Sequence, residues 1–116
     1  MEIKRLHVGK RLSEVAVHNG TVYLAGQIAE DATQNIEGQT RNVLASIDRL
    51  LAEAGTDKSR ILMCQIFIAD LKDFAGMNAV WDEWVADGNA PPRATVQAQL
   101  AKPEWLIEMV VTAAQP

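Results

Sequence analysis

The segment Ile61–Ala69, with the sequence ILMCQIFIA, is apolar at odd and at even positions except at Gln65. Successive side chains of a strand point to opposite faces of a sheet, so a strand with one solvated face shows alternating apolar and polar residues. Trp105–Ala113, close to the C-terminus, likewise has apolar residues at odd and at even positions around Glu108. Both segments therefore predict central strands that are covered on their two faces.

Turn chemistry predicts a β-hairpin in the N-terminal part of the chain. Val15–His18 and Thr21–Ala25 are rich in strand-forming residues and flank Asn19-Gly20. Asn-Gly tolerates positive φ at both positions, which a two-residue hairpin turn requires. Glu2–Val8 alternates loosely and is interpreted either as a first strand or as an arm.

Two stretches have helical periodicity. In the first, apolar residues recur at three and four positions from Ile36 to Ala54, and Gly55 ends the helix as a C-terminal cap. The second helix begins after Asp70 or Asp73, either of which can cap its N-terminus. Its inner stripe is Phe74, Met77, Asn78, Trp81, Trp84 and Val85.

The predicted order of elements is β-ββ-α-β-α-ββ within a single domain, residues 1–116. This order indicates an α+β fold, a single mixed six-stranded sheet with two helices packed on one face. The helices leave the other face of the sheet uncovered, and no further segment of the chain remains to cover it. A second copy of the chain is the simplest cover, so we expect a homo-oligomer with small-molecule sites between subunits.

Composition restricts the classes of function. The net charge is −4, which argues against a nucleic-acid groove because phosphate binding needs clustered Lys and Arg. No apolar run approaches the roughly 20 residues of a membrane helix, and Met1–Lys10 lacks the apolar core of a signal peptide. A single cysteine, Cys64, suits a reducing compartment. We therefore expect a cytoplasmic protein with no nucleic-acid and no membrane partner.

Several site chemistries find no support in the sequence. His7 and His18 do not stand at metal-ligand spacing with Cys64, so no metal is expected. Patterns such as G-x-S-x-G, G-x-G-x-x-G and the P-loop are missing, which argues against a nucleophile elbow and against nucleotide phosphates. Cys64 has no evident base beside it and is interpreted as a packed apolar residue, as is the pair Trp81 and Trp84.

Arg93 and Glu108 are the two charges of the closing strands, and the predicted pairing brings them to one face. If residues 101–104 form the loop, Leu100 pairs with Trp105 and Glu108 lies opposite Gln97. Such a register places Arg93 and Glu108 on the same face, four residues or roughly 13 Å apart along the ladder. A small ligand fits between two side chains that reach toward each other across this distance.

Arginine and glutamate in this arrangement suggest a carboxylate anchor and a group that orients or deprotonates a water. The alternative is a salt bridge across the strands, or two solvated charges, and the pattern alone favours this alternative. Glu108 needs a partner in either case, because it lies between Leu106 and Val110 in an otherwise apolar strand. For Asn78 the alternative to a site residue is a hydrogen-bonded core amide or a residue at the rim of the helix.

The chain resembles the RidA/YjgF family of trimeric enamine and imine deaminases over nearly its whole length. The residues that carry the resemblance are Gly26-Gln27-Ile28, Gln39-Thr40-Arg41-Asn42, Phe67-Ile68-Ala69-Asp70, Asp73-Phe74, Met77-Asn78-Ala79, Pro92-Arg93, Leu100 and Ile107-Glu108. Most specific is the closing signature, with fifteen residues from arginine to glutamate. Ser13-Glu14-Val15, Trp81/Trp84 and Ala90-Pro91-Pro92-Arg93 are similar to a short branch of the family.

This resemblance implies a chorismate mutase-like fold, a homotrimer with clefts between subunits, and no metal or organic cofactor. It implies that Arg93 holds the carboxylate of a 2-imino or 2-enamino acid, such as 2-aminoacrylate. Glu108 then helps water to attack the imine carbon, and Asn78 is retained from the family pattern. Ammonia leaves, and the product is a 2-keto acid.

Three substrate-binding positions depart from the family pattern. Leu12 stands in place of a tyrosine, Ala25 in place of a serine and Thr95 in place of a cysteine. The alternative function is therefore a non-catalytic trimer that binds a 2-keto acid or has a regulatory role. Ribonuclease or translation-inhibitor activity, described for some relatives, ranks third because the chain is acidic.

Overall fold

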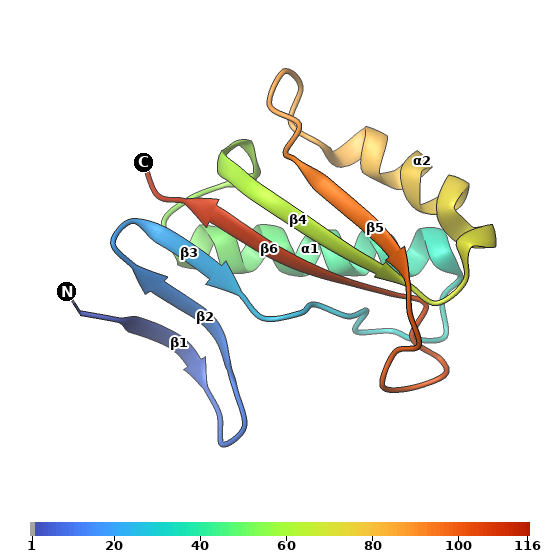
Figure 1. The fold of residues 1–116 in the computed structure, drawn as a ribbon, viewed down its shortest axis with the longest axis horizontal. Coiled ribbons are helices and arrows are strands. Elements are labelled where there is room, and N and C mark those ends of the chain that lie inside the picture. Colours follow the sequence, from blue (N-terminus) through green and yellow to red (C-terminus); the bar gives the residue numbers. More distant parts are fainter. Residues whose placement is uncertain (1) are drawn as a thin grey trace.

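The computed structural model describes residues 2–116, and within this range the chain forms a six-stranded sheet and two α-helices (Figure 1). The strands are β1 (Lys4–Val8), β2 (Ser13–His18), β3 (Thr21–Leu24), β4 (Ile61–Ile68), β5 (Arg93–Gln97) and β6 (Ile107–Ala114). The helices are α1 (Ile36–Glu53) and α2 (Phe74–Trp84), and the short 3₁₀ helices η1 (Lys58–Arg60) and η2 (Leu71–Asp73) precede β4 and α2. The predicted α+β class is confirmed.

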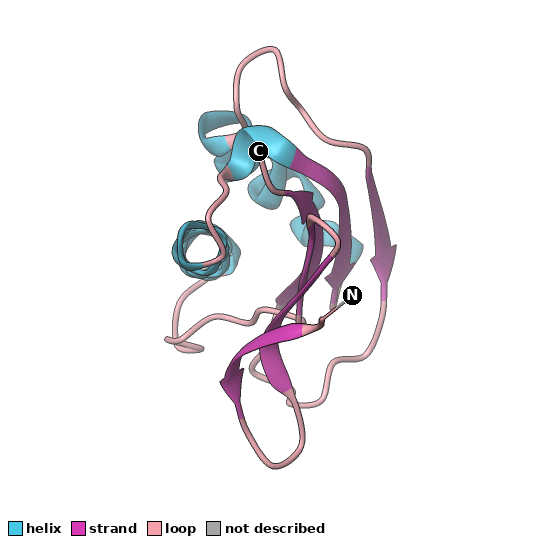
Figure 2. Cartoon of the chain, turned by 90° about the vertical axis from the view of Figure 1, so that its left-hand side faces the viewer, coloured by secondary structure: helices cyan, strands magenta, loops and turns pink. Residues whose placement is uncertain are grey.

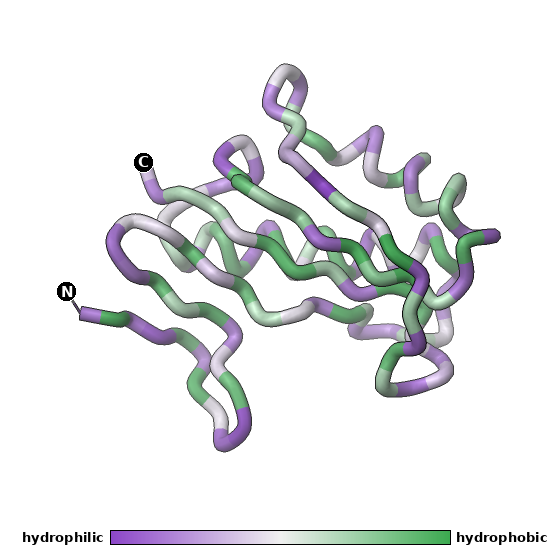
Figure 3. Tube along the Cα trace, in the orientation of Figure 1, coloured by the Kyte–Doolittle hydropathy of each residue, from purple (hydrophilic) through white to green (hydrophobic). Residues whose placement is uncertain are grey.

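The sheet has the order β1-β2-β3-β6-β4-β5. All neighbouring strands are antiparallel except β4 and β5, which run parallel, so the sheet is mixed as expected. β6 and β4 are internal strands, each with a hydrogen-bonded neighbour on both sides, and are mainly hydrophobic along their length (Figure 3). Their internal position agrees with the apolar residues at odd and even positions of both segments.

The β2–β3 hairpin forms at the predicted turn. Asn19 has φ of 53° and Gly20 has φ of 79°, the left-handed values that Asn-Gly tolerates in a two-residue turn. His18 pairs with Thr21 across this turn. The N-terminal segment is a strand rather than a free arm, because β1 pairs antiparallel with β2.

The predicted hairpin between the two closing strands is wrong. β5 pairs in parallel with β4, with Arg93 opposite Cys64, whereas β6 pairs with the other side of β4 and places Glu108 opposite Phe67. A parallel β4–α2–β5 crossover puts β5 at the edge of the sheet, and residues 98–106 then lead back past the end of β4. The sequence prediction paired neighbours in the chain, but apolar β4 takes a hydrogen-bonded neighbour on each side.

Both helices pack against the same face of the sheet. Figure 2 shows α1 end-on beside this face. The core residues on this face include Leu44 and Ile47 of α1, Met77 of α2, Ile66 of β4 and Met109 of β6, all almost fully buried. Gly76 of α2 lets the two helices approach, because a Cβ at this position would lie 2.8 Å from Ile36 Cγ2.

Residues 2–116 leave the opposite face of the sheet uncovered. Tyr23 of β3, Met63 of β4 and Val96 of β5 are exposed large apolar residues there, and Glu108 of β6 lies on the same face. The helices thus cover a single face, as predicted, whereas a second copy on the other face stays a prediction. Neither helix of residues 2–116 is long and apolar enough to cross a membrane.

Candidate functional site

Arg93, the first residue of β5, lies on the helix-covered face of the sheet beside Cys64. Its Nη2 donates a hydrogen bond of 2.7 Å to Asn78 Oδ1, and its Nη1 lies 3.8 Å from Met77 Sδ. The guanidinium carbon is 5.0 Å from the centre of the Trp81 ring, at cation–π distance. Three residues of α2 therefore fix the orientation of the Arg93 side chain.

The guanidinium of Arg93 opens into a hollow of about 460 Å³. Leu71, Phe74 and Thr95 line this hollow together with Arg93. A guanidinium has five N–H donors, so the contacts with Asn78 and Met77 leave donors for an incoming carboxylate. Arg93 forms no ion pair with a carboxylate of residues 2–116. The side chain is thus held in place with unused capacity for an anionic ligand.

Glu108 lies on β6 and faces the uncovered side of the sheet. It is half-buried between Phe67 of β4 and the segment that follows β3. Gln27 and Met109 form an isolated antiparallel bridge, with Gln27 N donating to Met109 O at 2.8 Å and Met109 N to Gln27 O at 3.1 Å. This bridge brings Gly26 so close to Glu108 that a Cβ on Gly26 would lie 2.9 Å from Glu108 Cδ.

The Glu108 carboxylate lines a second hollow of about 690 Å³. The other lining residues are Leu12, Glu14, Gly26, Gln27, Ile28, Ala29, Glu30, Ala32, Ser46, Arg49, Ala101, Lys102 and Trp105. Leu12 thus lies in the same hollow as Glu108. Ala25 is adjacent to Gly26, and its carbonyl accepts a hydrogen bond of 3.0 Å from Gln27 Nε2.

Arg93 and Glu108 point to opposite faces of the sheet, and the prediction that they share a face is wrong. Arg93 is in register with Cys64, and Glu108 with Phe67. Cys64 and Phe67 are three residues apart on β4, an odd step that reverses the face. A salt bridge between Arg93 and Glu108 within one chain is therefore excluded, and so is a ligand held between them by one subunit.

The predicted site residues form two groups. Arg93, Asn78 and Thr95 gather at β5 and α2, whereas Glu108, Leu12 and Ala25 gather where the β3 end approaches β6. The side chain of Asn78 accepts a hydrogen bond from Arg93. Sequence reasoning interpreted Trp81 as a core residue and did not connect it with Arg93. Its position one helical turn after Asn78, on the same stripe, is the signal that could have joined them.

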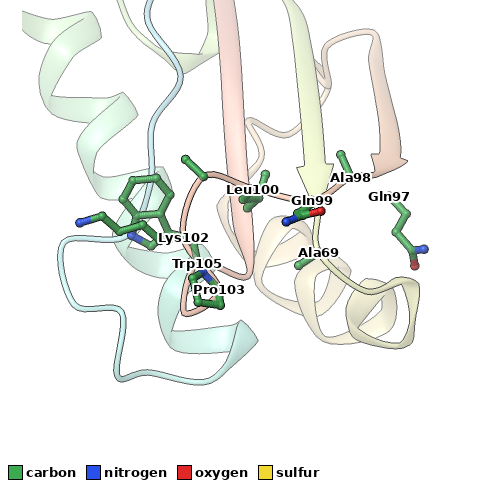
Figure 4. Close-up of a pocket in the computed structure, with 9 residues that line it drawn as sticks. Ala69, Gln97, Ala98, Gln99, Leu100, Lys102, Pro103 and Trp105 are labelled. Atoms are coloured by element: carbon green, nitrogen blue, oxygen red, sulfur yellow. The ribbon is translucent and has the colours of Figure 1, made fainter.

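A third hollow, of about 560 Å³, lies below the ends of β4 and β5 and contains neither Arg93 nor Glu108. Figure 4 shows Lys102, Pro103 and Trp105 on one side of it and Gln97 and Ala98 on the other. The Lys102 ammonium is 5.3 Å from the Trp105 ring centre. Lys102 is the charged residue of this lining, and its ammonium lies over the Trp105 ring.

Cys64 and the acidic and histidine side chains bear on two further chemistries, thiol catalysis and metal binding. Burial raises the pKa of the Cys64 thiol to about 12, although the neighbouring Arg93 acts to lower it. Cys64 is therefore a protonated core thiol at neutral pH rather than a nucleophile. Within residues 2–116 no group of three or more His, Cys, Asp or Glu side chains is arranged to hold a metal ion.

Comparison with known proteins assigns the chain to a family. The family model described as Endoribonuclease L-PSP matches residues 2–115. The chain belongs to the RidA/YjgF family. Membership covers the whole fold, including the β5 and β6 strands that carry Arg93 and Glu108.

Relatives within the RidA/YjgF family are similar over their full length. A RutC family protein from Haemophilus ducreyi is 51% identical over 112 residues, 97% of this chain and 96% of that protein. RutC family protein YoaB from Escherichia coli is 45% identical over 114 residues, 98% and 99% of the two chains. The crystal structure of a YjgF family member from Neisseria meningitidis has a TM-score of 0.97 at 44% identity, covering 100% of this chain and 97% of that chain.

Proposed function

We propose that the protein is an imine deaminase that hydrolyses 2-imino acids, and the 2-enamino acids from which they arise, to 2-keto acids and ammonia. The observation that carries this proposal is Arg93, whose guanidinium is fixed by Asn78 and Trp81 and still has donors free toward a hollow. A planar guanidinium with free donors is suited to bidentate binding of a carboxylate. Leu12, Ala25 and Thr95 alter the substrate pocket but leave this anchor unchanged.

The proposed reaction needs a carboxylate anchor and a proton acceptor. Arg93 binds the carboxylate of the 2-imino acid, and Glu108 accepts a proton from water as its oxygen bonds to the imine carbon. The imine nitrogen takes a proton from solvent, and a tetrahedral carbinolamine forms. Glu108 then returns its proton to the amino group, and the C–N bond breaks as the carbinolamine oxygen forms the carbonyl. Ammonia leaves, and the hydroxyl proton released to solvent replaces the one that the nitrogen took up, so a 2-keto acid forms without a cofactor.

A complete site requires two copies of the chain, because Arg93 and Glu108 lie on opposite faces of one sheet. The exposed apolar residues around Glu108 give a second copy a surface to cover. We propose a homotrimer in which the β5 edge of one subunit, with Arg93, approaches the Glu108 face of the next. The proposed clefts between subunits then combine the two groups of site residues.

Activity is tested by generating 2-aminoacrylate in situ and following the release of ammonia and pyruvate. The protein should accelerate release over the spontaneous rate. Arg93→Ala should lower kcat/KM by roughly 10- to 150-fold, corresponding to the loss of a charge-assisted bond of about 1.5–3 kcal/mol. Spontaneous release unchanged by the wild-type protein would rule out the deaminase.

Subunit mixing tests whether the two residues come from different copies. Arg93→Ala and Glu108→Ala subunits are each expected to have strongly reduced activity alone. Mixed trimers formed by co-refolding at equal amounts should regain about a quarter of the sites, since each site needs one intact Arg93 and one intact Glu108 from neighbours. The control is a mixture of Arg93→Ala with wild-type subunits, which should lose about half of the activity. No recovery in the mixture of variants would contradict a shared site.

Binding of a 2-keto acid without turnover is the second candidate. The observation that favours it is Leu12 in the Glu108 hollow, where a side chain without a hydroxyl cannot hydrogen-bond to a substrate. Calorimetric titration with pyruvate distinguishes the candidates when combined with the ammonia assay. Binding that depends on Arg93 in a protein that releases no ammonia would favour this second function.

A further inference from the structure

The hollow at Arg93 has an apolar wall made by two large side chains. Leu71 and Phe74 are 53% and 38% exposed, although both are apolar and both line the same hollow as Arg93. Thr95 supplies the remaining wall. A ligand whose carboxylate binds Arg93 therefore has an apolar surface within reach of the atoms attached to its α-carbon.

The apolar wall is fixed relative to the anchor. Leu71 N donates a hydrogen bond of 2.8 Å to Gln97 Oε1, and Gln97 lies on the same strand and face as Arg93 and Thr95. Asp70 caps the η2 turn by accepting 2.9 Å from Lys72 N. Phe74 follows directly as the first residue of α2, the helix whose Asn78 and Trp81 hold Arg93. The wall and the anchor thus belong to one hydrogen-bonded unit.

An apolar wall beside a carboxylate anchor discriminates between substrates by their side chains. The three-carbon imine formed from 2-aminoacrylate presents a single methyl group, whereas imines related to leucine or phenylalanine present a large apolar group. One methylene in an apolar pocket changes kcat/KM by roughly 10- to 200-fold. A second charged group on the ligand would lie against Leu71 and Phe74 without a partner.

We infer that Leu71 and Phe74 make this site selective for 2-imino acids with a bulky apolar side chain, over three-carbon and over dicarboxylic ones. This inference rests on the proposed function, because it assigns the substrate class of the same site. The apolar side chain lies on the wall of Leu71 and Phe74 while Arg93 holds the carboxylate.

The test compares kcat/KM for imines generated in situ from L-leucine, L-alanine and L-glutamate by amino acid oxidases. Release of ammonia is followed while semicarbazide traps the imine that remains. The leucine-derived imine should be hydrolysed at least 10-fold more efficiently than the alanine-derived one, and the glutamate-derived imine least efficiently. Comparable values for the leucine and alanine imines would overturn the selectivity and leave the deaminase intact.

The variant Phe74→Ala assigns the preference to the wall. It should lower kcat/KM for the leucine-derived imine by roughly 10-fold or more and leave the alanine-derived one within a few-fold of wild type. Val8→Ala, which truncates another exposed apolar residue far from Arg93 in the sheet, is the matched control and should change neither. An equal loss on both substrates, or a lower mass in sedimentation, would mean that Phe74 serves the fold or assembly and would overturn the inference.

Ligand binding keeps the inference testable if no imine is hydrolysed. Calorimetry with 4-methyl-2-oxopentanoate and with pyruvate should then give tighter binding of the former, lost in Phe74→Ala. That result would retain the selectivity while the deaminase fails. Equal affinities, or a difference that persists in Phe74→Ala, would overturn the selectivity itself.

Discussion

At the scale of single residues, Gly26 shows how closely a functional side chain is fitted. Its backbone is not in the left-handed region, so the absence of a side chain matters for space rather than for conformation. The three atoms that a Cβ would meet all belong to Glu108. The glycine therefore leaves room for the carboxylate proposed to activate water.

Gly26→Ala should displace the Glu108 carboxylate and lower kcat/KM for imine hydrolysis by roughly 10-fold or more, because the reacting groups are no longer aligned. The destabilisation measured in urea should be about 1–3 kcal/mol, typical of an overpacked site. The same change in a Glu108→Ala background should cost almost nothing, because the clashing atoms are gone. A full cost in that background would show that the clash lies elsewhere.

Cys64 provides a prediction on pH. Its pKa rises from an ordinary 9.0 to about 12, mainly through burial. The thiol should resist iodoacetamide in the folded protein at pH 7–9 and react once urea unfolds the chain. The unfolded state loses this proton first, so the free energy of unfolding should fall as the pH rises from about 9 to about 12. Rapid alkylation of the folded protein at pH 8 would contradict the prediction.

At the scale of elements, Gln39 ties helix α1 to two loops. Its fully buried amide donates to the carbonyls of Ala32, Gln34 and Glu104 at 3.3, 3.1 and 3.0 Å. Its Oε1 accepts 3.0 Å from Leu106 N. Gln39 thus fixes the loop between β5 and β6, although this loop is far away in the sequence. The loop ends just before Glu108.

Gln39→Leu should destabilise the protein by about 2–5 kcal/mol, since it removes the partner of several buried backbone groups at once. Urea unfolding measures this change, and Gln99→Leu, at an exposed position, is the control. Hydrogen exchange should report faster exchange at the Leu106 amide in the variant. A loss of less than about 1 kcal/mol would show that water replaces the glutamine without cost.

At the scale of the whole molecule, the uncovered face decides the state of assembly. The chain forms a flat body of 43 × 38 × 20 Å with helices on one face only. Apolar residues remain exposed on the other, and Glu108 lies among them. The proposed trimer would bury this face and complete the site in the same step.

The variant Met63→Lys should convert the proposed trimer into monomers, because it places a charge on the face to be buried. Sedimentation equilibrium should give about three times the chain mass for the wild type and a single chain mass for the variant. Ala52→Lys, which adds the same charge at an exposed position of α1 away from that face, is the control for net charge. A wild-type protein that sediments as a monomer would rule out the trimer and, with it, the shared site.

Much of the fold follows from the sequence because the relevant forces are local. The Asn19-Gly20 turn, the two helical stripes and the apolar centre of β4 depend on residues close together in the chain. The family motifs likewise pointed to Arg93, Asn78 and Glu108. What could not be predicted was the partner of β5, because strand pairing is decided between segments distant in sequence.

The sequence by itself determined the elements, their order, the family and the identity of the charged residues. The tertiary structure alone decided that Arg93 and Glu108 face opposite ways, since their faces depend on β4 lying between β5 and β6. Successive side chains of a strand point to opposite faces of the sheet. Two residues whose partners on β4 are an odd number of positions apart therefore lie on opposite faces. For the same reason the proposed site between subunits takes Arg93 and Glu108 from different copies, whereas the predicted pairing had placed them on one face of one copy.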